Sequence, residues 1–225
     1  MKKIVAQLKA VGLAAVISMV FCAGAQSAVI ASFDVNGQAG STQEGYTALT
    51  TNAGGLGSAT VNGITVTITQ AVAERARTDK RGWFANNPDD PEWDLYRDFS
   101  FGGTVAADAI KVTISGLSAN TAYDFRWYHY DSWPGFFQTM SVYQDDTTGD
   151  ALFTASYTVD TDPHTTGNSL FTATSDGTGT IDLVTSIEEG SRFNGLDVIP
   201  EPATSGLLLL GAVAGLGLLR RKLYG

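Results

Sequence analysis

Apolar and polar residues alternate along most of this 225-residue chain, and the alternation restricts the fold more than any other feature of the sequence. In residues 60–69, 109–115 and 122–130, Val, Ile, Phe, Tyr or Trp recur at every second position. Successive side chains of a β-strand point to opposite faces, so this pattern is typical of half-buried strands. Segments of the same style follow at 140–142, 152–159, 170–174, 181–187 and 193–199.

Turn residues separate these segments and set the fold class. Gly102-Gly103 and Asp176-Gly177 stand between predicted strands, and Asn62-Gly63 predicts a hairpin turn or a bulge within 60–69. About nine to eleven strands, spaced roughly 8–14 residues apart, predict an all-β protein with an antiparallel two-sheet sandwich. Between the two chain ends no segment reads as a helix. The nearest candidate is 70–80, whose Ala and Arg content favours a helix only weakly.

The first 28 residues have the organisation of a secretory signal peptide. Lys2, Lys3 and Lys9 precede an apolar stretch at 10–21, and small residues with the spacing of a cleavage site follow. An uncleaved membrane anchor is the alternative. The only cysteine, Cys22, lies within this segment, so the exported part has neither a disulfide nor thiolate chemistry.

The last residues of the chain predict a single transmembrane helix. Residues 203–219 form an uncharged, largely apolar run of 17 residues, at the lower limit for crossing a bilayer. Arg220, Arg221 and Lys222 follow directly and predict a cytoplasmic C-terminus. A buried core helix is a poor alternative, because the run has no polar face.

The C-terminal order of features resembles the PEP-CTERM sorting signal of Gram-negative bacteria. The matching parts are Pro200, Glu201 and Pro202, then the apolar run, then Arg220 and Arg221. The resemblance implies cleavage near the triplet by an exosortase, a membrane cysteine protease, in organisms that make exopolysaccharide and biofilm matrix. The two prolines keep the cleavage segment extended.

The two end segments divide the chain into three parts. They are a signal peptide (1–28), a β-sandwich domain (29–199) and a sorting signal (200–225). We expect the protein to be exported across the inner membrane, anchored there transiently by its C-terminal helix, and then present at the cell surface or in the extracellular matrix.

The exported part is strongly acidic. Residues 29–199 hold 22 Asp and Glu against 8 Lys and Arg, a net charge of −14 compared with −9 for the whole chain. A field of this sign repels nucleic acid and anionic membrane and attracts divalent cations, so we expect neither nucleic acid nor an anionic membrane surface as a main partner.

Three segments of the predicted sandwich are similar to galactose-binding-like jelly rolls of the malectin kind. They are YRDFSF at 96–101, VTISGLSANTAYDFRWYHYD at 112–131 and FNGLDV at 193–198. The resemblance implies a jelly-roll sandwich and binding of a sugar. The chain departs from the family at 133–137, where a short turn is expected.

Two aromatic-rich segments, 81–98 and 125–137, supply the candidate ligand-binding residues. Aromatic rings stack on the C–H faces of sugars, while Arg and Asp side chains bond the hydroxyl groups. The candidates are Trp83, Trp93, Arg97, Trp127, Tyr128, Tyr130, Asp131 and Trp133. The alternative is that these aromatic side chains fill the core and that 81–98 is a solvated acidic loop.

Oxygen ligands for Ca²⁺ occur near both ends of the predicted sandwich. Asp34 and Asn36 lie near the first strand and Asp197 near the last, so they would share a structural Ca²⁺ if the two ends meet. Residues 145–150 and 160–164 also carry carboxylates without the spacing of a calcium-binding loop, and plain turn chemistry is their alternative. No other cofactor is expected.

Together these features predict a non-catalytic carbohydrate-binding module, for which exopolysaccharide or matrix is the expected ligand. A structural surface or biofilm-matrix protein without sugar recognition is one alternative. A polysaccharide-degrading enzyme is another, but Asp89-Asp90 and Glu188-Glu189 are adjacent and would point to opposite faces of a strand. No G-x-S-x-G or H-E-x-x-H motif is present.

Overall fold

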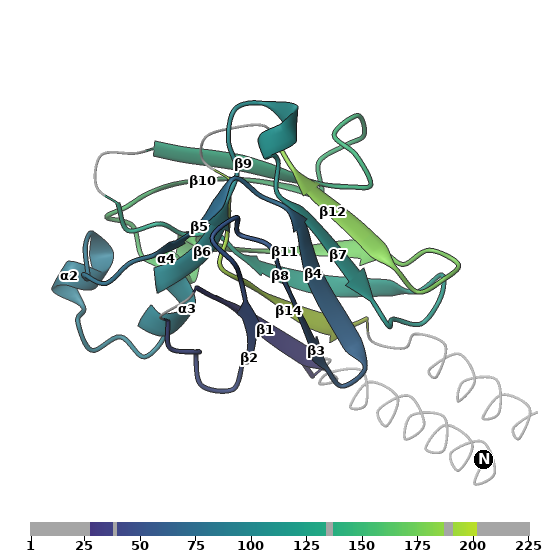
Figure 1. The fold of residues 1–225 in the computed structure, drawn as a ribbon, viewed down its shortest axis with the longest axis horizontal. Helices are drawn as coiled ribbons and strands as arrows, with labels where there is room; N and C mark the ends of the chain where they lie inside the picture. Colours follow the sequence, from purple (N-terminus) through teal and green to yellow (C-terminus); the bar gives the residue numbers. More distant parts are fainter. Residues whose placement is uncertain (1–27, 38–39, 134–136, 187–190, 202–225) are drawn as a thin grey trace, which may run out of the picture. The chain divides into compact units, whose positions relative to one another are not determined.

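Two β-sheets face each other and enclose the main hydrophobic core (Figure 1). The computed structural model describes residues 28–37, 40–133, 137–186 and 191–201. Within these ranges it has fourteen strands, more than the sequence pattern predicts, because strands of two to four residues leave no clear alternation. The all-β sandwich prediction is confirmed.

The first sheet has five strands. Their order is β11 (Asn168–Thr174), β8 (Ala122–Tyr128), β14 (Gly195–Pro200), β1 (Ala31–Asn36) and β2 (Thr47–Thr50). The first and last strands of the domain therefore pair with each other, antiparallel, inside the sheet. The β1/β2 pair is parallel, which departs from the predicted antiparallel arrangement.

The second sheet has six strands. Their order is β10 (Phe153–Thr158), β9 (Phe137–Gln144), β12 (Ile181–Thr185), β7 (Lys111–Ser115), β4 (Ile64–Gln70) and β3 (Gly57–Val61). Asn62 and Gly63 connect β3 to β4 with φ of 53° and 81°, the geometry of a type I′ turn. The predicted hairpin is thus confirmed.

A third, smaller sheet covers one end of the sandwich. Its order is β13 (Arg192–Phe193), β6 (Asp98–Phe101) and β5 (Ala73–Ala76). Strand β5 lies within 70–80, so the helix candidate there was wrong. Four backbone pairs with β6 and a guanidinium–ring contact between Arg75 and Phe101 outweigh the weak helix propensity.

The main core takes one face of each large sheet. Side chains of Phe33, Phe125, Trp127 and Leu196 from the first sheet meet those of Val66, Val112, Val142 and Leu183 from the second. Trp127 is fully buried and its indole N–H donates to the Arg192 carbonyl at 2.9 Å. Its ring packs on Phe193, with 4.4 Å between the ring centroids.

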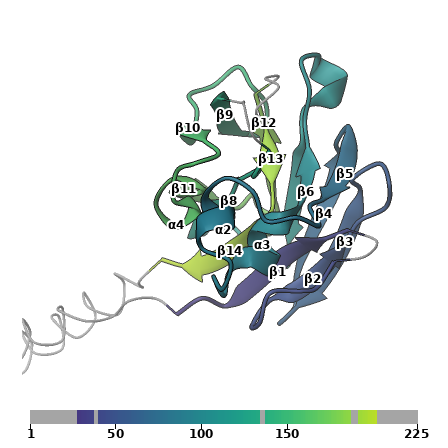
Figure 2. The same cartoon turned by 90° about the vertical axis from the view of Figure 1, so that its left-hand side faces the viewer.

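Short helices lie at one end of the molecule (Figures 1 and 2). They are α2 (Trp83–Asn86), α3 (Trp93–Arg97) and α4 (Pro163–Thr166), and a 3₁₀ turn, η1 (Ala106–Asp108), lies elsewhere. The expectation that no segment between the chain ends is a helix was therefore wrong, because helices of four or five residues are too short to show a helical period. Residues 81–98 form no strand before β6, as predicted.

A second aromatic cluster covers the outer face of the five-stranded sheet beneath these helices. Its buried members are Phe84, Trp93, Leu95, Tyr96, Tyr128, Tyr130 and Tyr157. Tyr128 follows Trp127 on β8 and points away from the main core, as the period of a strand requires. Both faces of β8 are therefore buried at its Trp127–Tyr128 end, whereas Asp124 and Arg126, earlier on the outer face, are half-buried.

No helix in the described part of the chain is long and apolar enough to cross a membrane. The predicted signal peptide and C-terminal helix, with Pro202, Arg220 and Arg221, lie outside the described residues. Pro200 is the last residue of β14, and Glu201 follows it.

Trp127, which is buried in the main core, and Trp133, which is exposed, should contribute differently to the stability of the fold. Trp127→Ala should lower the free energy of unfolding by about 3–5 kcal/mol, since it empties a buried site. Trp133→Ala should cost about 1 kcal/mol or less, because that side chain is 39% exposed. Urea unfolding of the purified variants measures both values, and equal losses would contradict this assignment of buried and exposed rings.

Candidate functional site

Arginine and phenylalanine side chains share one face of the small sheet. Arg75 of β5 lies opposite Phe99 of β6, and Arg192 of β13 lies opposite Phe101. The Arg192 guanidinium carbon lies 5.3 Å from the Phe99 ring centroid and 5.7 Å from that of Phe101. Aromatic faces attract cations, so these rings hold the guanidinium groups in place.

A hollow of about 410 Å³ opens on this face. It is lined by Arg75, Arg77, Asp131, Trp133 and Arg192. Asp131 is almost fully buried and accepts two bonds from Arg77, Nε to Oδ1 at 3.0 Å and Nη2 to Oδ2 at 2.9 Å. Arg192 Nε donates to Oδ2 of the same carboxylate at 3.3 Å. Asp131 thereby holds two guanidinium groups at fixed positions.

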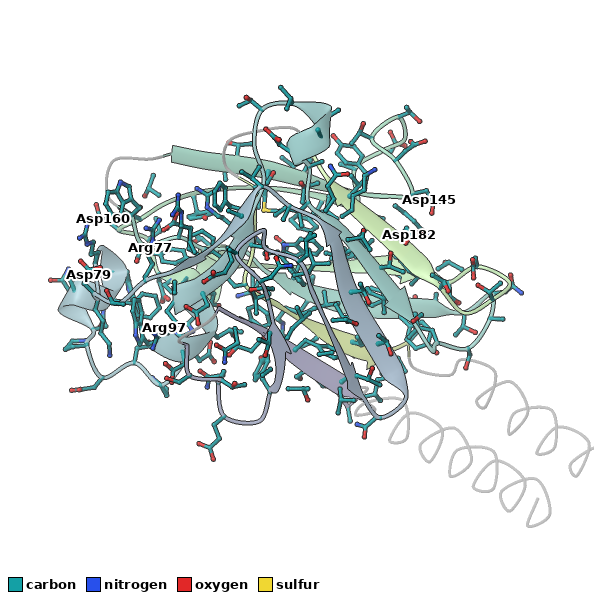
Figure 3. The ribbon with its side chains drawn as sticks, in the orientation of Figure 1. Arg77, Asp79, Arg97, Asp145, Asp160 and Asp182 are labelled. Carbon is teal, nitrogen blue, oxygen red and sulfur yellow. The ribbon has the colours of Figure 1, made fainter. Side chains whose placement is uncertain are left out.

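Trp133 forms the exposed aromatic part of the hollow. Its backbone N–H donates to Asp131 Oδ1 at 3.0 Å. The guanidinium carbons of Arg77 and Arg81 lie 4.8 and 4.6 Å from its ring centroid. Figure 3 shows Arg77 toward the α2 end of the molecule. The indole therefore carries two cations close to its ring.

The hollow reverses the charge of the surrounding domain. Arg75, Arg77 and Arg192, which line it, and Arg81, which lies over the Trp133 ring, are four of the eight basic residues between 29 and 199. Among the described residues, Asp131 and Asp79 are the carboxylates that pair with them, and no described carboxylate lies within 4 Å of Arg75. Such a group of planar guanidinium donors is suited to a carboxylate or another oxyanion.

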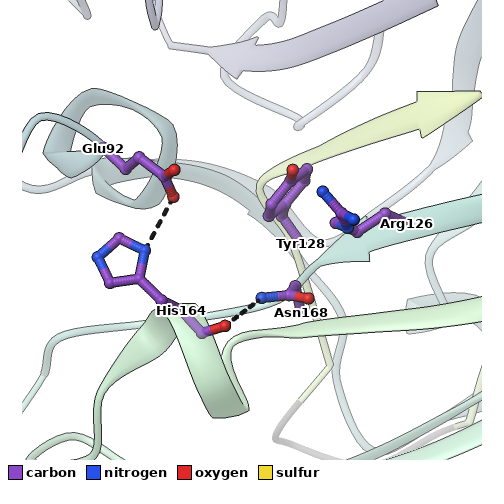
Figure 4. A pocket seen from close by; sticks show the side chains of 5 residues that line it. All are labelled: Glu92, Arg126, Tyr128, His164 and Asn168. Atoms are coloured by element: carbon purple, nitrogen blue, oxygen red, sulfur yellow. Dashed lines mark hydrogen bonds and ion pairs between the residues drawn. The ribbon is translucent and has the colours of Figure 1, made fainter. Parts of the chain in front are cut away.

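A second hollow, of about 290 Å³, lies on the outer face of the five-stranded sheet. Its lining residues are Glu92, Arg126, Tyr128, His164 and Asn168 (Figure 4). His164 uses both ring nitrogens, with Nδ1 3.0 Å from Glu92 Oε2 and Nε2 2.8 Å from Asp90 Oδ2. These contacts hold α4 against the start of α3. His164 therefore contributes to packing as well as lining the hollow.

Tyr128 connects this hollow to the sheet beneath it. Its hydroxyl lies 2.8 Å from that of Tyr46 and donates to Asp197 Oδ2 at 2.9 Å. Burial and the charge of Asp197 raise the pKa of Tyr128 to about 12. The tyrosine therefore stays protonated and acts as a donor at neutral pH.

The structure separates the predicted ligand-binding residues. Asp131 and Trp133 meet in the arginine hollow, and Tyr128 lines the second hollow. Trp127 lies in the main core, while Trp93 and Tyr130 are buried in the second cluster, against which the half-buried Trp83 packs. Arg97 pairs at 3.6 Å with both Asp94 and Asp98.

The sequence analysis missed Arg75, Arg77 and Arg192, the arginines that line the hollow. Arg75 and Arg77 do carry a signal, since basic residues two apart share a face if the segment is a strand. Interpreting 70–80 as a helix hides that signal. Arg192 lies more than a hundred residues away, and no local pattern connects it with them.

The three predicted calcium ligands also divide. Asp34 and Asn36 lie in β1 beside Asp98, whereas Asp197 bonds to Tyr128 and lies 3.6 Å from Arg126 Nη1. Burial raises the pKa of Asp34 to about 8 and that of Asp98 to about 6. The described residues contain no group of three or more His, Cys, Asp or Glu placed to hold a metal.

The carboxylates of 145–150 and 160–164 make local turn contacts. Asp146 Oδ1 accepts from the Thr148 N–H at 2.8 Å. Asp162 caps α4 by accepting from the His164 N–H at 2.9 Å. These contacts agree with the turn-chemistry interpretation of both segments.

Comparison with known proteins does not name a family for this chain. No protein-family model and no curated protein matches it. Among solved structures, it is similar to the P-domain of Penaeus vannamei nodavirus, with 19% identity over 45% of this chain and 93% of that domain. The TM-score is 0.31, so this likeness carries no argument about fold or function.

His164 should make the attachment of α4 depend on pH. Burial alone would lower its pKa, but the hydrogen bond to Asp90 and the charge of Glu92 outweigh burial and raise it. A raised pKa stabilises the folded protein below the unfolded value of about 6.5, and this contribution is lost as pH rises through the folded value. The difference in Tm between wild type and His164→Gln should therefore be larger at pH 5.5 than at pH 9.

Both proteins keep the buried His129, whose lowered pKa has the opposite effect, so its contribution cancels in that difference. A difference in Tm that is the same at both pH values would show that the His164 charge is not involved.

Proposed function

We propose that this protein is an exported, exosortase-sorted, non-catalytic module that binds acidic polysaccharide through the arginine hollow beside Trp133. The observation that carries the proposal is the exposed indole with two guanidinium groups over its ring, next to a carboxylate that holds two of the four arginines in place. The jelly-roll, galactose-binding-like interpretation of the sandwich belongs to this proposal, supported by the pairing of β1 with β14.

The proposed class of ligand follows from the contacts of the Trp133 indole. Cations lie close to the ring, so the surface offers guanidinium N–H groups together with an aromatic edge. A neutral sugar supplies only hydroxyl groups, whereas a uronic acid also supplies a carboxylate that can accept two parallel bonds from one guanidinium. Such a carboxylate would first reach Arg75, which is exposed, and Arg81, which is half-buried.

The acidic remainder of the domain limits which polyanions fit. A nucleic acid duplex presents one charge per about 1.7 Å and needs a long basic surface. Here the basic residues form a single hollow in a domain of net charge −14. The hollow is large enough for one or two sugar carboxylates. Salt screens their repulsion from the distant acidic residues more strongly than it screens their attraction to the arginines in contact with them.

The sorting part of the proposal depends on the C-terminal sequence. The order Pro200-Glu201-Pro202, apolar run and basic cluster supports cleavage by an exosortase near the triplet, with Glu201 as a sorting determinant. The helix would hold the exported protein at the inner membrane until then, after which it would reach the surface or matrix.

Binding to polygalacturonate, with neutral dextran as the comparison, tests the glycan part. Affinity gel electrophoresis of the purified protein should show retardation by polygalacturonate alone. Trp133→Ala and Arg75→Gln should each weaken binding about tenfold, the loss of roughly one charge-assisted hydrogen bond or stacking contact. Arg126→Gln is the matched control, because it removes a guanidinium that is 43% exposed outside the hollow.

Each contrary result identifies what is wrong. Equal retardation by dextran would reject the acidic class, and unchanged binding of Arg75→Gln would reject the hollow as the site. No retardation by either polymer would favour a structural matrix protein. Release of shorter oligosaccharides from polygalacturonate would favour the degrading enzyme.

The sorting prediction has its own measurement. In a host with an exosortase, mass spectrometry of the exported protein should find a C-terminus near residue 200 and no residue of 203–225. Replacing Pro200, Glu201 and Pro202 by alanine should leave the full C-terminus attached and the protein in the membrane fraction. Normal cleavage of that variant would reject the triplet as the signal.

A further inference from the structure

Buried oxygen atoms without donors gather on the outer face of β1. Asp34 Oδ1, Asn36 Oδ1 and both carboxylate oxygens of Asp98 are inaccessible to solvent, and none has a hydrogen-bond partner in the described residues. Asp34 and Asp98 are fully buried and Asn36 is nearly so. An unsatisfied buried polar group is costly, so these oxygens call for a donor or a cation beyond Arg97, whose guanidinium already pairs with Asp98.

The backbone brings the three residues together from distant parts of the sequence. Asp34 and Asn36 are two apart on β1 and therefore share a face. Asn194 links β1 to the start of β6, since its carbonyl accepts from the Val35 N–H at 2.7 Å and its Nδ2 donates to the Asp98 carbonyl at 3.1 Å. A Cβ built on Gly40 would fall against both Asp98 Oδ2 and Asn36 Oδ1. These two oxygens thus point to the same small space.

Two nearby donors already serve other oxygens, and the Gly37 N–H lies close enough to the Asp98 carboxylate to offset part of the rise in pKa that burial causes. The Gln43 N–H donates to Asp34 Oδ2 at 2.7 Å, which leaves Oδ1. Asn36 Nδ2 donates to Thr42 Oγ1 at 2.8 Å, which turns the amide oxygen away from that contact. Gln43 Oε1 is a further buried oxygen without a donor in the described residues.

The neighbouring arginine does not satisfy the carboxylates. Arg97 Nε lies 3.6 Å from Asp98 Oδ1, beyond hydrogen-bonding distance, and Nη1 lies 3.6 Å from Asp94 Oδ1. Figure 3 shows Arg97 near the α3 end of the molecule. One guanidinium is therefore shared by two carboxylates, and Asp34 receives no ion pair within the described residues.

We propose that Asp34, Asn36 and Asp98 form a Ca²⁺ site that ties β1, the 40–46 segment and β6 together. Two carboxylates and an amide supply hard oxygen ligands, which Ca²⁺ accepts in sets of six to eight, with backbone carbonyls and water completing the shell. Mg²⁺ fits less well, because it demands a near-ideal octahedron and gives up water reluctantly. Asp197 belongs to the Tyr128 network and is not a ligand of this site.

Thermal unfolding and isothermal calorimetry of the EDTA-treated full-length protein test the site with CaCl₂ and MgCl₂ as the probes. Ca²⁺ at about 100 times its Kd should raise Tm by about 5–10 °C, and Mg²⁺ should raise it less. Asp98→Asn should unfold at a higher temperature than wild type in EDTA, because it removes a buried charge, and should lose the Ca²⁺ shift.

A second variant and two controls protect the test against a folding failure. Asn36→Asp adds a carboxylate to the site, so it should lower Tm in EDTA and enlarge the Ca²⁺ shift. Asp197→Asn and Asp146→Asn change a buried and an exposed carboxylate outside the site, and both should keep the wild-type shift. The site is rejected if wild type shows neither shift nor heat, if Asp98→Asn keeps the full shift, or if either control loses it.

Discussion

Burial of both faces of β8 at its Trp127–Tyr128 end is the constraint on which the rest of the structure depends. Trp127 points into the main core between the two large sheets, and its neighbour Tyr128 points into the second cluster beneath α2, α3 and α4. The strand is thus the shared wall of two cores. It leads directly to Tyr130 and Asp131, so the packing that holds β8 also fixes where the arginine hollow begins.

The arginine hollow is positively charged, whereas the domain as a whole is acidic. A net charge of −14 would keep polyanions away, yet half of the basic residues between 29 and 199 gather around Asp131 and Trp133. Asp131 is what allows this, because one buried carboxylate accepting from Arg77 and Arg192 offsets part of their repulsion. The hollow therefore stays compact and positive, which is the basis of the proposed selectivity for acidic glycans.

The small sheet joins the two candidate sites through opposite faces of one strand. On β6, Phe99 and Phe101 support the guanidinium groups of the hollow, while Asp98 turns to the buried oxygens of β1. A cation bound at Asp98 would stiffen the strand that carries those rings. The two proposals stay separable, since one is measured by glycan binding and the other by stability without glycan.

The sequence by itself determined the strands with clear alternation, a turn or bulge at Asn62-Gly63, the all-β class and the absence of a regular strand in 81–97, because these are properties of neighbouring residues. Only the tertiary structure decided that Trp127 is core while Trp133 is exposed, and that 73–76 is a strand. It alone joined Arg192 to Arg77, and Asp98 to Asp34 and Asn36. Those outcomes depend on contacts between residues far apart in the chain, which no local pattern records.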